Sequence, residues 1–116
     1  MGLDLIIENG TVVTPGGEVK TDIAVEDDKI LALGDAGAFP KPERVVDAKG
    51  KIVIPGGIDT HSHFELLFMG ARPPETWDIG TIAAAIGGTT TTIDFAPMGK
   101  GKSVLVAAKT QFARAD

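Results

Sequence analysis

The sequence predicts an α/β protein in which a small antiparallel β-sandwich over residues 1–55 is followed by strand–helix units over residues 56–116. Two observations lead to this prediction. Short β-prone runs separated by turn residues fill the first half, a pattern typical of a sandwich. After Pro55 the pattern changes to strand, helix, strand, helix, which is typical of parallel βα units.

The first half divides into short strands at its glycine, proline and aspartate residues. Asn9-Gly10 tolerates the positive φ angles of a two-residue hairpin, so we expect the strands on either side of it to pair. Residues 22–26 alternate apolar with polar or small side chains, the period of a half-buried strand, and Asp27-Asp28 forms a turn after them. The expected strands are residues 3–7, 11–14, 22–26, 29–33, 44–47 and 51–54.

The second half contains two helix signals and one strong strand signal. Thr76 is expected to cap a helix that Gly87-Gly88 ends. Residues 89–95 are rich in β-branched side chains and predict a buried strand, and Ser103 is expected to cap a second helix. Two βα units cannot close a barrel, which needs eight, so we expect this chain to be the N-terminal part of a larger protein.

Composition excludes several classes of function. The 116 residues include 11 Lys and Arg against 16 Asp and Glu, a formal net charge of -5, which disfavours nucleic-acid binding. There is no cysteine, so disulfides and thiolate metal sites are excluded. Because there is no signal-peptide pattern and no apolar stretch of about 18 residues, we expect a cytoplasmic protein without a membrane partner.

The chemistry centres on the only two histidines, His61 and His63. In an extended strand, residues i and i+2 point to one side, so their imidazoles could share one divalent ion. The apolar run 52–54 leads into the pair, which places it at the C-terminal end of a strand, where barrel enzymes carry their active sites. Asp59 has the same parity and could accept a hydrogen bond from a ligand imidazole or from another nearby group. Two surface histidines that bind no metal remain the alternative.

Other polar residues near the pair receive weaker assignments. Asp94 ends the second apolar strand, so it is expected either to point near the barrel mouth, where it would support the site without binding metal, or to cap the next loop. Lys100 and Lys102 flank a glycine and are expected to be solvated surface charges. Ser62 should face away from the metal, and no spare histidine could act as its base.

An apolar cluster follows the histidines. Two interpretations of this cluster stay open, core packing and a wall of the substrate pocket. Its members are Phe64, Leu67, Phe68 and Met69.

Several segments resemble one enzyme family. Residues 55–63, Pro-Gly-Gly-Ile-Asp-Thr-His-Ser-His, resemble the first metal motif of the amidohydrolase superfamily. Residues 64–70, 80–90 and 93–95 are similar to the loop, helix and strand that follow this motif in the dihydropyrimidinase and hydantoinase branch. Residues 5–10 resemble the small N-terminal β-domain of that branch, so the resemblance covers essentially the whole chain.

The resemblance implies a TIM-type (β/α)8 barrel, of which this chain holds the first two βα units. It also implies two divalent ions, usually zinc, with His61 and His63 on the more buried one. A metal-activated hydroxide would open the ring of a small cyclic amide such as a dihydropyrimidine or hydantoin. The family's remaining ligands, a carboxylated lysine, two histidines and an aspartate, lie on later strands. We therefore expect the chain to be inactive alone. The resemblance also implies that the complete protein is a homo-oligomer.

Two alternatives to this function remain. One is a related amidohydrolase such as an allantoinase, a dihydroorotase or a deaminase. The other is a non-catalytic relative that keeps the fold for assembly after losing metal ligands. Retention of both histidines argues against the second.

Overall fold

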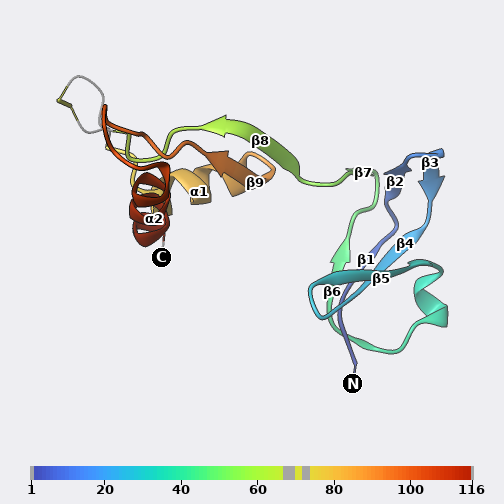
Figure 1. Cartoon of the computed structure of the whole chain (residues 1–116). Helices are drawn as coiled ribbons and strands as arrows, with labels where there is room; N and C mark the ends of the chain where they lie inside the picture. The colour runs from blue at the N-terminus through green and yellow to red at the C-terminus, as the bar shows by residue number, and fades with distance from the viewer. Residues whose placement is uncertain (1, 67–69, 72–73, 116) are drawn as a thin grey trace. The chain divides into compact units, whose positions relative to one another are not determined.

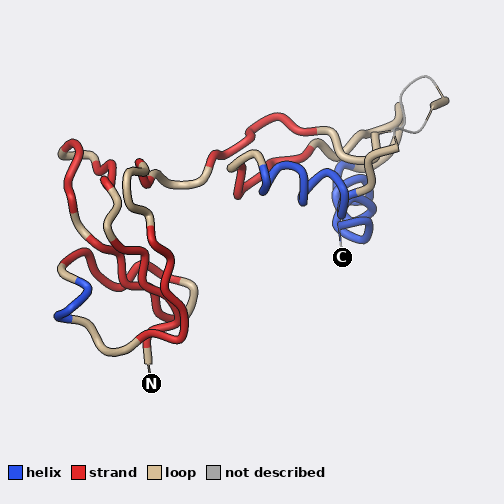
Figure 2. The backbone as a smooth tube through the Cα atoms, turned by 180° about the vertical axis from the view of Figure 1, so that it is seen from behind, coloured by secondary structure: helices blue, strands red, loops and turns tan. Residues whose placement is uncertain are grey.

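The computed structural model describes residues 2–66, 70–71 and 74–115 (Figure 1). The chain folds as two compact units, Met1–Pro55 and Gly56–Asp116. The regular elements of the first are strands apart from one short 3-10 turn, and the described residues of the second form two strands and two helices (Figure 2). The mixed α/β composition predicted from the sequence is confirmed. No helix within the described ranges is long and apolar enough to cross a membrane.

The first unit has a four-stranded and a three-stranded sheet. The larger has the order β5-β4-β1-β6 and the smaller β3-β2-β7. Their members are β1 (Leu3–Glu8), β2 (Thr11–Thr14), β3 (Gly17–Lys20), β4 (Asp22–Glu26), β5 (Lys29–Gly34), β6 (Pro42–Asp47) and β7 (Ile52–Val53). A single 3-10 turn, η1 (Ala36–Ala38), joins β5 to β6.

The core of this unit is small and apolar. Leu3, Ile6 and Ala24 form one buried cluster, and Ala36 and Phe39 pack against it. These residues come from β1, β4 and the segment around η1, so the core holds together parts of the chain that are distant in sequence. Burial of such side chains is the main term that stabilises a sheet of this size.

The prediction of a hairpin at Asn9-Gly10 is wrong. β1 pairs with β4 and β6, whereas β2 pairs with β3 and β7, so the dipeptide carries the chain from one sheet to the other. Only Asn9 has a positive φ, 63°, while a type I′ turn requires it at both central residues. A Cβ at Gly10 would lie 2.7 Å from Val53 Cγ2, so glycine is needed there for close approach of the neighbouring strand.

The residues with the backbone of a two-residue hairpin are Asp27 and Asp28, with φ of 49° and 58°. They join β4 to β5 in antiparallel register, where a turn was predicted. The prediction that the whole unit is antiparallel is wrong, because β1–β6 and β2–β7 are parallel pairs. The backbone bonds from Ala48 N to Glu8 O and from Thr11 N to Lys51 O continue this parallel pairing between the sheets, at 2.8 and 3.0 Å.

The second unit contains β8 (Gly57–Ser62), α1 (Trp77–Ile86), β9 (Thr89–Asp94) and α2 (Val104–Ala115). β8 and β9 pair in parallel, as expected of a βαβ unit. Thr76 caps α1 by accepting a hydrogen bond from Ile79 N, and Gly87 is its C-cap. Ser103 Oγ accepts from Leu105 N at the start of α2, at 3.3 Å. The predicted helix starts and the glycine stop are confirmed.

The second unit leaves most of its apolar side chains open to solvent. Among its described residues only the polar Ser62 and Gln111 are buried. Residues 89–95 were expected to form a buried strand, but Ile93 is 55% and Phe95 47% exposed. The reason is that β9 has one neighbouring strand, β8, whereas parallel strands are usually covered on both faces.

Candidate metal centre

The strand β8 brings the two histidines together. His61 lies within β8 and His63 directly after its end, and the two Nε2 atoms are 3.1 Å apart. Their ring centroids are 5.0 Å apart with an angle of 74° between the planes. Both side chains are exposed, so an ion or a substrate could reach them from solvent.

The separation of the Nε2 atoms suits a shared cation. Two nitrogens that each bind zinc at about 2.1 Å, with a tetrahedral angle between them, lie about 3.4 Å apart. The observed 3.1 Å is a few tenths of an ångström shorter. Without a cation, the same distance fits a hydrogen bond in which one Nε2–H donates to the other ring. In both cases the Nε2 atoms, rather than other ring atoms, lie next to each other.

Phe95 contacts both imidazoles. Its ring centroid is 4.4 Å from that of His61 and 4.9 Å from that of His63. Its backbone N donates to Ser62 O at 3.2 Å, which extends the pairing of β8 with β9 to the end of both strands. Phe95, directly after β9, therefore supports the pair and limits the orientations that the two imidazoles can take.

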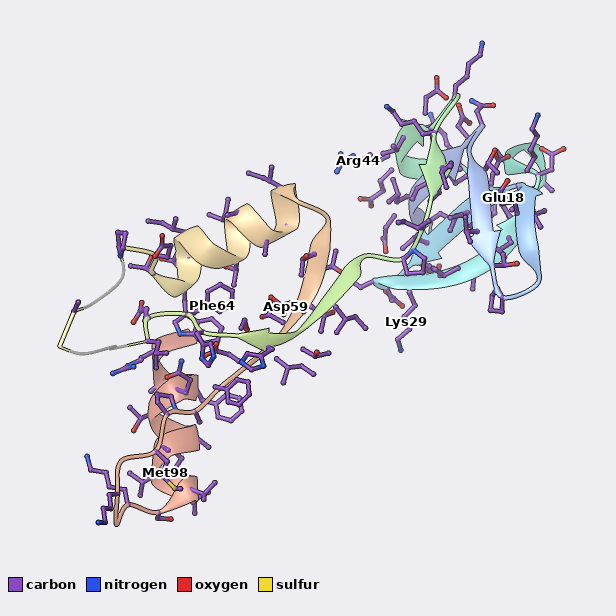
Figure 3. All side chains as sticks on the ribbon, turned by 90° about the horizontal axis from the view of Figure 1, so that it is seen from above. Glu18, Lys29, Arg44, Asp59, Phe64 and Met98 are labelled. Carbon is purple, nitrogen blue, oxygen red and sulfur yellow. The ribbon has the colours of Figure 1, made fainter. Side chains whose placement is uncertain are left out.

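The carboxylate of Asp59 bonds to the backbone rather than to a ring. Its Oδ1 accepts a hydrogen bond from His61 N at 3.0 Å. Asp59 lies along β8 (Figure 3), and it lines an open pocket of about 480 Å³ together with both histidines, Phe64 and Glu75. Its bond fixes the main chain directly before the first imidazole.

Asp94 fixes the main chain directly after the second imidazole. Its Oδ1 accepts a hydrogen bond from Phe64 N at 2.9 Å, and its Oδ2 accepts one from Gln111 Nε2 at 2.6 Å. The Phe64 ring packs on Trp77 with 4.8 Å between centroids. Gln111 is buried, and its side-chain amide links the end of β9 to the residues that follow β8.

The remaining candidates fall in three groups. Ser62 is buried, and its Oγ has no hydrogen-bond partner among the described residues. Lys100 and Lys102 are exposed before α2. Leu67, Phe68 and Met69 lie outside the described residues. Within the ranges that the structure describes, no third His, Cys, Asp or Glu joins the pair in a group that could hold a metal.

The sequence profile of the amidohydrolase family matches residues 44–114, well over half of the chain. The chain belongs to the amidohydrolase family. The resemblance noted from its sequence is thereby confirmed, and the matched range includes β8, both histidines and nearly all of the second unit.

The amidohydrolase chain is similar to enzymes of the hydantoinase branch. D-hydantoinase of Ralstonia pickettii is 43% identical over 102 residues, which cover 88% of this chain and 22% of that protein. Dihydropyrimidinase of Dictyostelium discoideum is 45% identical over 103 residues, or 89% of this chain and 20% of that protein. A solved D-hydantoinase structure, 41% identical, superposes on 97% of this chain and 24% of its own with a TM-score of 0.90.

This amidohydrolase chain thus spans about a fifth of the length of the curated relatives it matches.

The sequence analysis missed two residues that contact the histidine segment. Phe95 has a positional signal, since it follows the strand that runs parallel to β8. Gln111 has none, because a single glutamine in a helix with exposed apolar residues gives no indication that it is buried.

Proposed function

We propose that the protein is a metal-dependent hydrolase that opens cyclic amides of the hydantoin or dihydropyrimidine type. The observation that carries the proposal is the convergence of the His61 and His63 Nε2 atoms, 3.1 Å apart, at the end of a parallel strand. Membership of the amidohydrolase family and similarity to a D-hydantoinase and a dihydropyrimidinase support it. In this proposal β8 and β9 are the first two strands of a TIM-type barrel.

The two imidazoles would hold the more buried of two zinc ions. Neutral imidazole nitrogen is a common zinc ligand, and their spacing fits a shared ion. Such an ion supplies Lewis-acid chemistry, lowering the pKa of a coordinated water and polarising a carbonyl oxygen. Zinc takes about four donors, so further ligands would come from outside the described residues.

The side chains around the pair would keep the imidazoles oriented. Asp59 holds the amide of His61, and Asp94 holds the amide of Phe64, so a carboxylate fixes the backbone on each side of the ligand segment. Phe95 limits the tilt of both rings. Preorganised ligands of this kind bind metal more tightly than ligands that must be ordered on binding.

The apolar residues after the pair would form the wall of the substrate pocket. The Phe64 ring packs against Trp77, and Phe64 is the residue of this group that the structure describes. Leu67, Phe68 and Met69 are proposed to contact the ring substituent of the substrate. A cyclic amide is largely apolar at its substituent and polar at its carbonyls, which suits an apolar wall beside a cation.

The metal assignment is tested by removing both ligands. In the complete product of the coding sequence, H61A/H63A should lose bound zinc, measured by mass spectrometry of metal content. K100A, a change of an exposed side chain before α2, is the control and should retain it. Metal content equal to wild type in H61A/H63A would defeat the assignment.

The substrate class is tested with hydantoin, dihydrouracil, allantoin and dihydroorotate given to the same preparation. Turnover of hydantoin or dihydrouracil is expected. Preference for allantoin or dihydroorotate would move the protein to another branch of the family. A metal-free protein that turns over none of the four would instead support a non-catalytic role in assembly.

A further inference from the structure

Gln111 is an unusual residue in its helix. It is 7% exposed, whereas Val104, Leu105 and Phe112 of the same helix are each more than 60% exposed. α2 therefore buries a polar side chain and leaves apolar ones in solvent. Burial of an amide is costly unless its hydrogen bonds are made, so the partners of Gln111 indicate why it lies there.

The Gln111 amide has partners for both its ends. Nε2 donates to Asp94 Oδ2 at 2.6 Å and to Phe64 O at 3.3 Å. Oε1 accepts from Arg114 Nη1 at 3.5 Å. The opposite orientation of the amide would place Oε1 against a carboxylate and a carbonyl, which are both acceptors, so the chemistry of the partners determines the orientation.

These bonds complete a clamp on one residue. Phe64 N donates to Asp94 Oδ1 at 2.9 Å, and Phe64 O accepts from Gln111. Both the N–H and the carbonyl of Phe64 therefore make hydrogen bonds. Gln111 also donates to the Asp94 carboxylate that accepts from Phe64 N. The N–H of Phe64 belongs to the peptide unit that follows His63, so its direction fixes the ψ angle of His63.

We propose that Gln111 is a positioning residue for the histidine pair, acting through Asp94 and the backbone of Phe64. Through these bonds, α2 helps to fix the backbone of His63, to which the imidazole is attached. The proposal rests on the metal-dependent function proposed above, because its effect is on how well the two imidazoles are preorganised for one ion. Loss of a group bonded directly to a metal ligand typically weakens metal binding about 10- to 100-fold, and because Gln111 acts through Asp94 and Phe64 we expect an effect at the lower end of this range.

The first test compares two methionine substitutions in α2. Q111M keeps the length of the side chain and removes both donors, while K109M changes an exposed residue of the same helix. Metal-stripped complete protein is titrated with Co²⁺ in competition with a chromophoric chelator, and the visible Co²⁺ spectrum is recorded. We expect about 10-fold weaker binding and an altered spectrum for Q111M, with K109M unchanged. Q111M affinity within about twofold of wild type would overturn the proposal.

A second pair of variants separates positioning from general destabilisation. Q111E places a carboxylate against Asp94 and should bind Co²⁺ more weakly than wild type. D94N/Q111E exchanges amide and carboxylate and restores the hydrogen bond between residues 94 and 111, but not the one to Phe64 O, so it should recover part of the lost affinity. This comparison applies even if Q111M does not fold. No recovery in the exchanged pair would overturn the proposal.

The same titration of H61A/H63A distinguishes the two proposals. If this variant binds Co²⁺ as wild type does, the metal-dependent function fails, and the role of Gln111 fails with it. If it loses Co²⁺ while Q111M keeps it, only the role of Gln111 fails.

Discussion

His61 lies against the ring of Phe95, with 4.4 Å between the two ring centroids. The contact joins the ends of two parallel strands, β8 and β9, and Phe95 makes a second contact with His63. Aromatic pairs at this distance contribute about 0.5–1.5 kcal/mol beyond the area they bury. The Phe95 ring therefore stabilises one arrangement of the two imidazoles.

F95L should weaken zinc binding several-fold, because leucine cannot support both imidazoles at once. Stability should fall by about 1 kcal/mol or less, since Phe95 is 47% exposed. Isothermal titration of the metal-stripped protein measures the first effect and denaturant unfolding the second. F112L changes a phenylalanine that is 72% exposed and serves as the matched control. Equal zinc affinity in F95L and F112L would contradict this role.

G80A should destabilise the second unit, although alanine is ordinarily the better helix former by about 1 kcal/mol. A Cβ at Gly80 would clash with Cδ1 and Cε1 of the Phe64 ring, which packs against Trp77. Overpacking of this kind costs about 1–3 kcal/mol. Denaturant unfolding followed by circular dichroism measures the change. G80A/F64L should be less destabilised than G80A, and a G80A protein more stable than wild type would refute the close contact.

The carboxyl of Asp47 should titrate below its ordinary value. The side chain of Asn9 donates to it at 3.0 Å and lowers its pKa, with a smaller contribution from Lys49 N. A lowered folded-state pKa stabilises the fold above the unfolded value of 3.8, and this stabilisation is lost as pH falls through the folded value. N9G retains the positive φ at this position and removes the donor. Carbon NMR of the carboxyl groups should show the Asp47 pKa rise in N9G, and an unchanged pKa would exclude this cause.

The 116-residue chain by itself should hydrolyse no cyclic amide. The described residues bring together two imidazole ligands, and zinc takes about four donors. Hydantoin and dihydrouracil incubated with zinc-loaded chain should remain intact by liquid chromatography. Ring opening above the rate of the H61A/H63A chain would show that two ligands suffice.

Local signals in the sequence predicted the helix ends of the second unit well. The Thr76 and Ser103 caps and the Gly87-Gly88 stop depend on a few adjacent residues, so they could be recognised without tertiary contacts. The apolar run 52–54, expected to lead into the histidines, is instead β7 of the first unit over Ile52–Val53, and the strand that leads into the pair, β8, begins at Gly57. β3 was missed because its sequence, Gly-Glu-Val-Lys, contains one apolar side chain and so shows no apolar alternation. The Asn9-Gly10 hairpin failed because pairing with β6 and β7, much later in the sequence, determines the path of the chain there.

For the candidate site, the i, i+2 spacing predicted which imidazoles could meet, because strand geometry is local. The hydrogen bonds that hold the segment around the two histidines were harder to predict from the sequence. Asp94 and Gln111 reach Phe64 across 30 and 47 residues, and neither separation has a periodic signal. Asp59 shares the parity of the histidines, yet its carboxylate bonds to the His61 amide, a choice between backbone and ring that parity does not specify.

An anomalous difference map from crystals of the complete protein grown with zinc tests whether His61 and His63 share one ion. A zinc peak about 2.1 Å from the Nε2 atoms of both residues is expected. Zinc bound elsewhere, with the two rings hydrogen-bonded only to each other, would contradict the proposed metal centre and the function that depends on it.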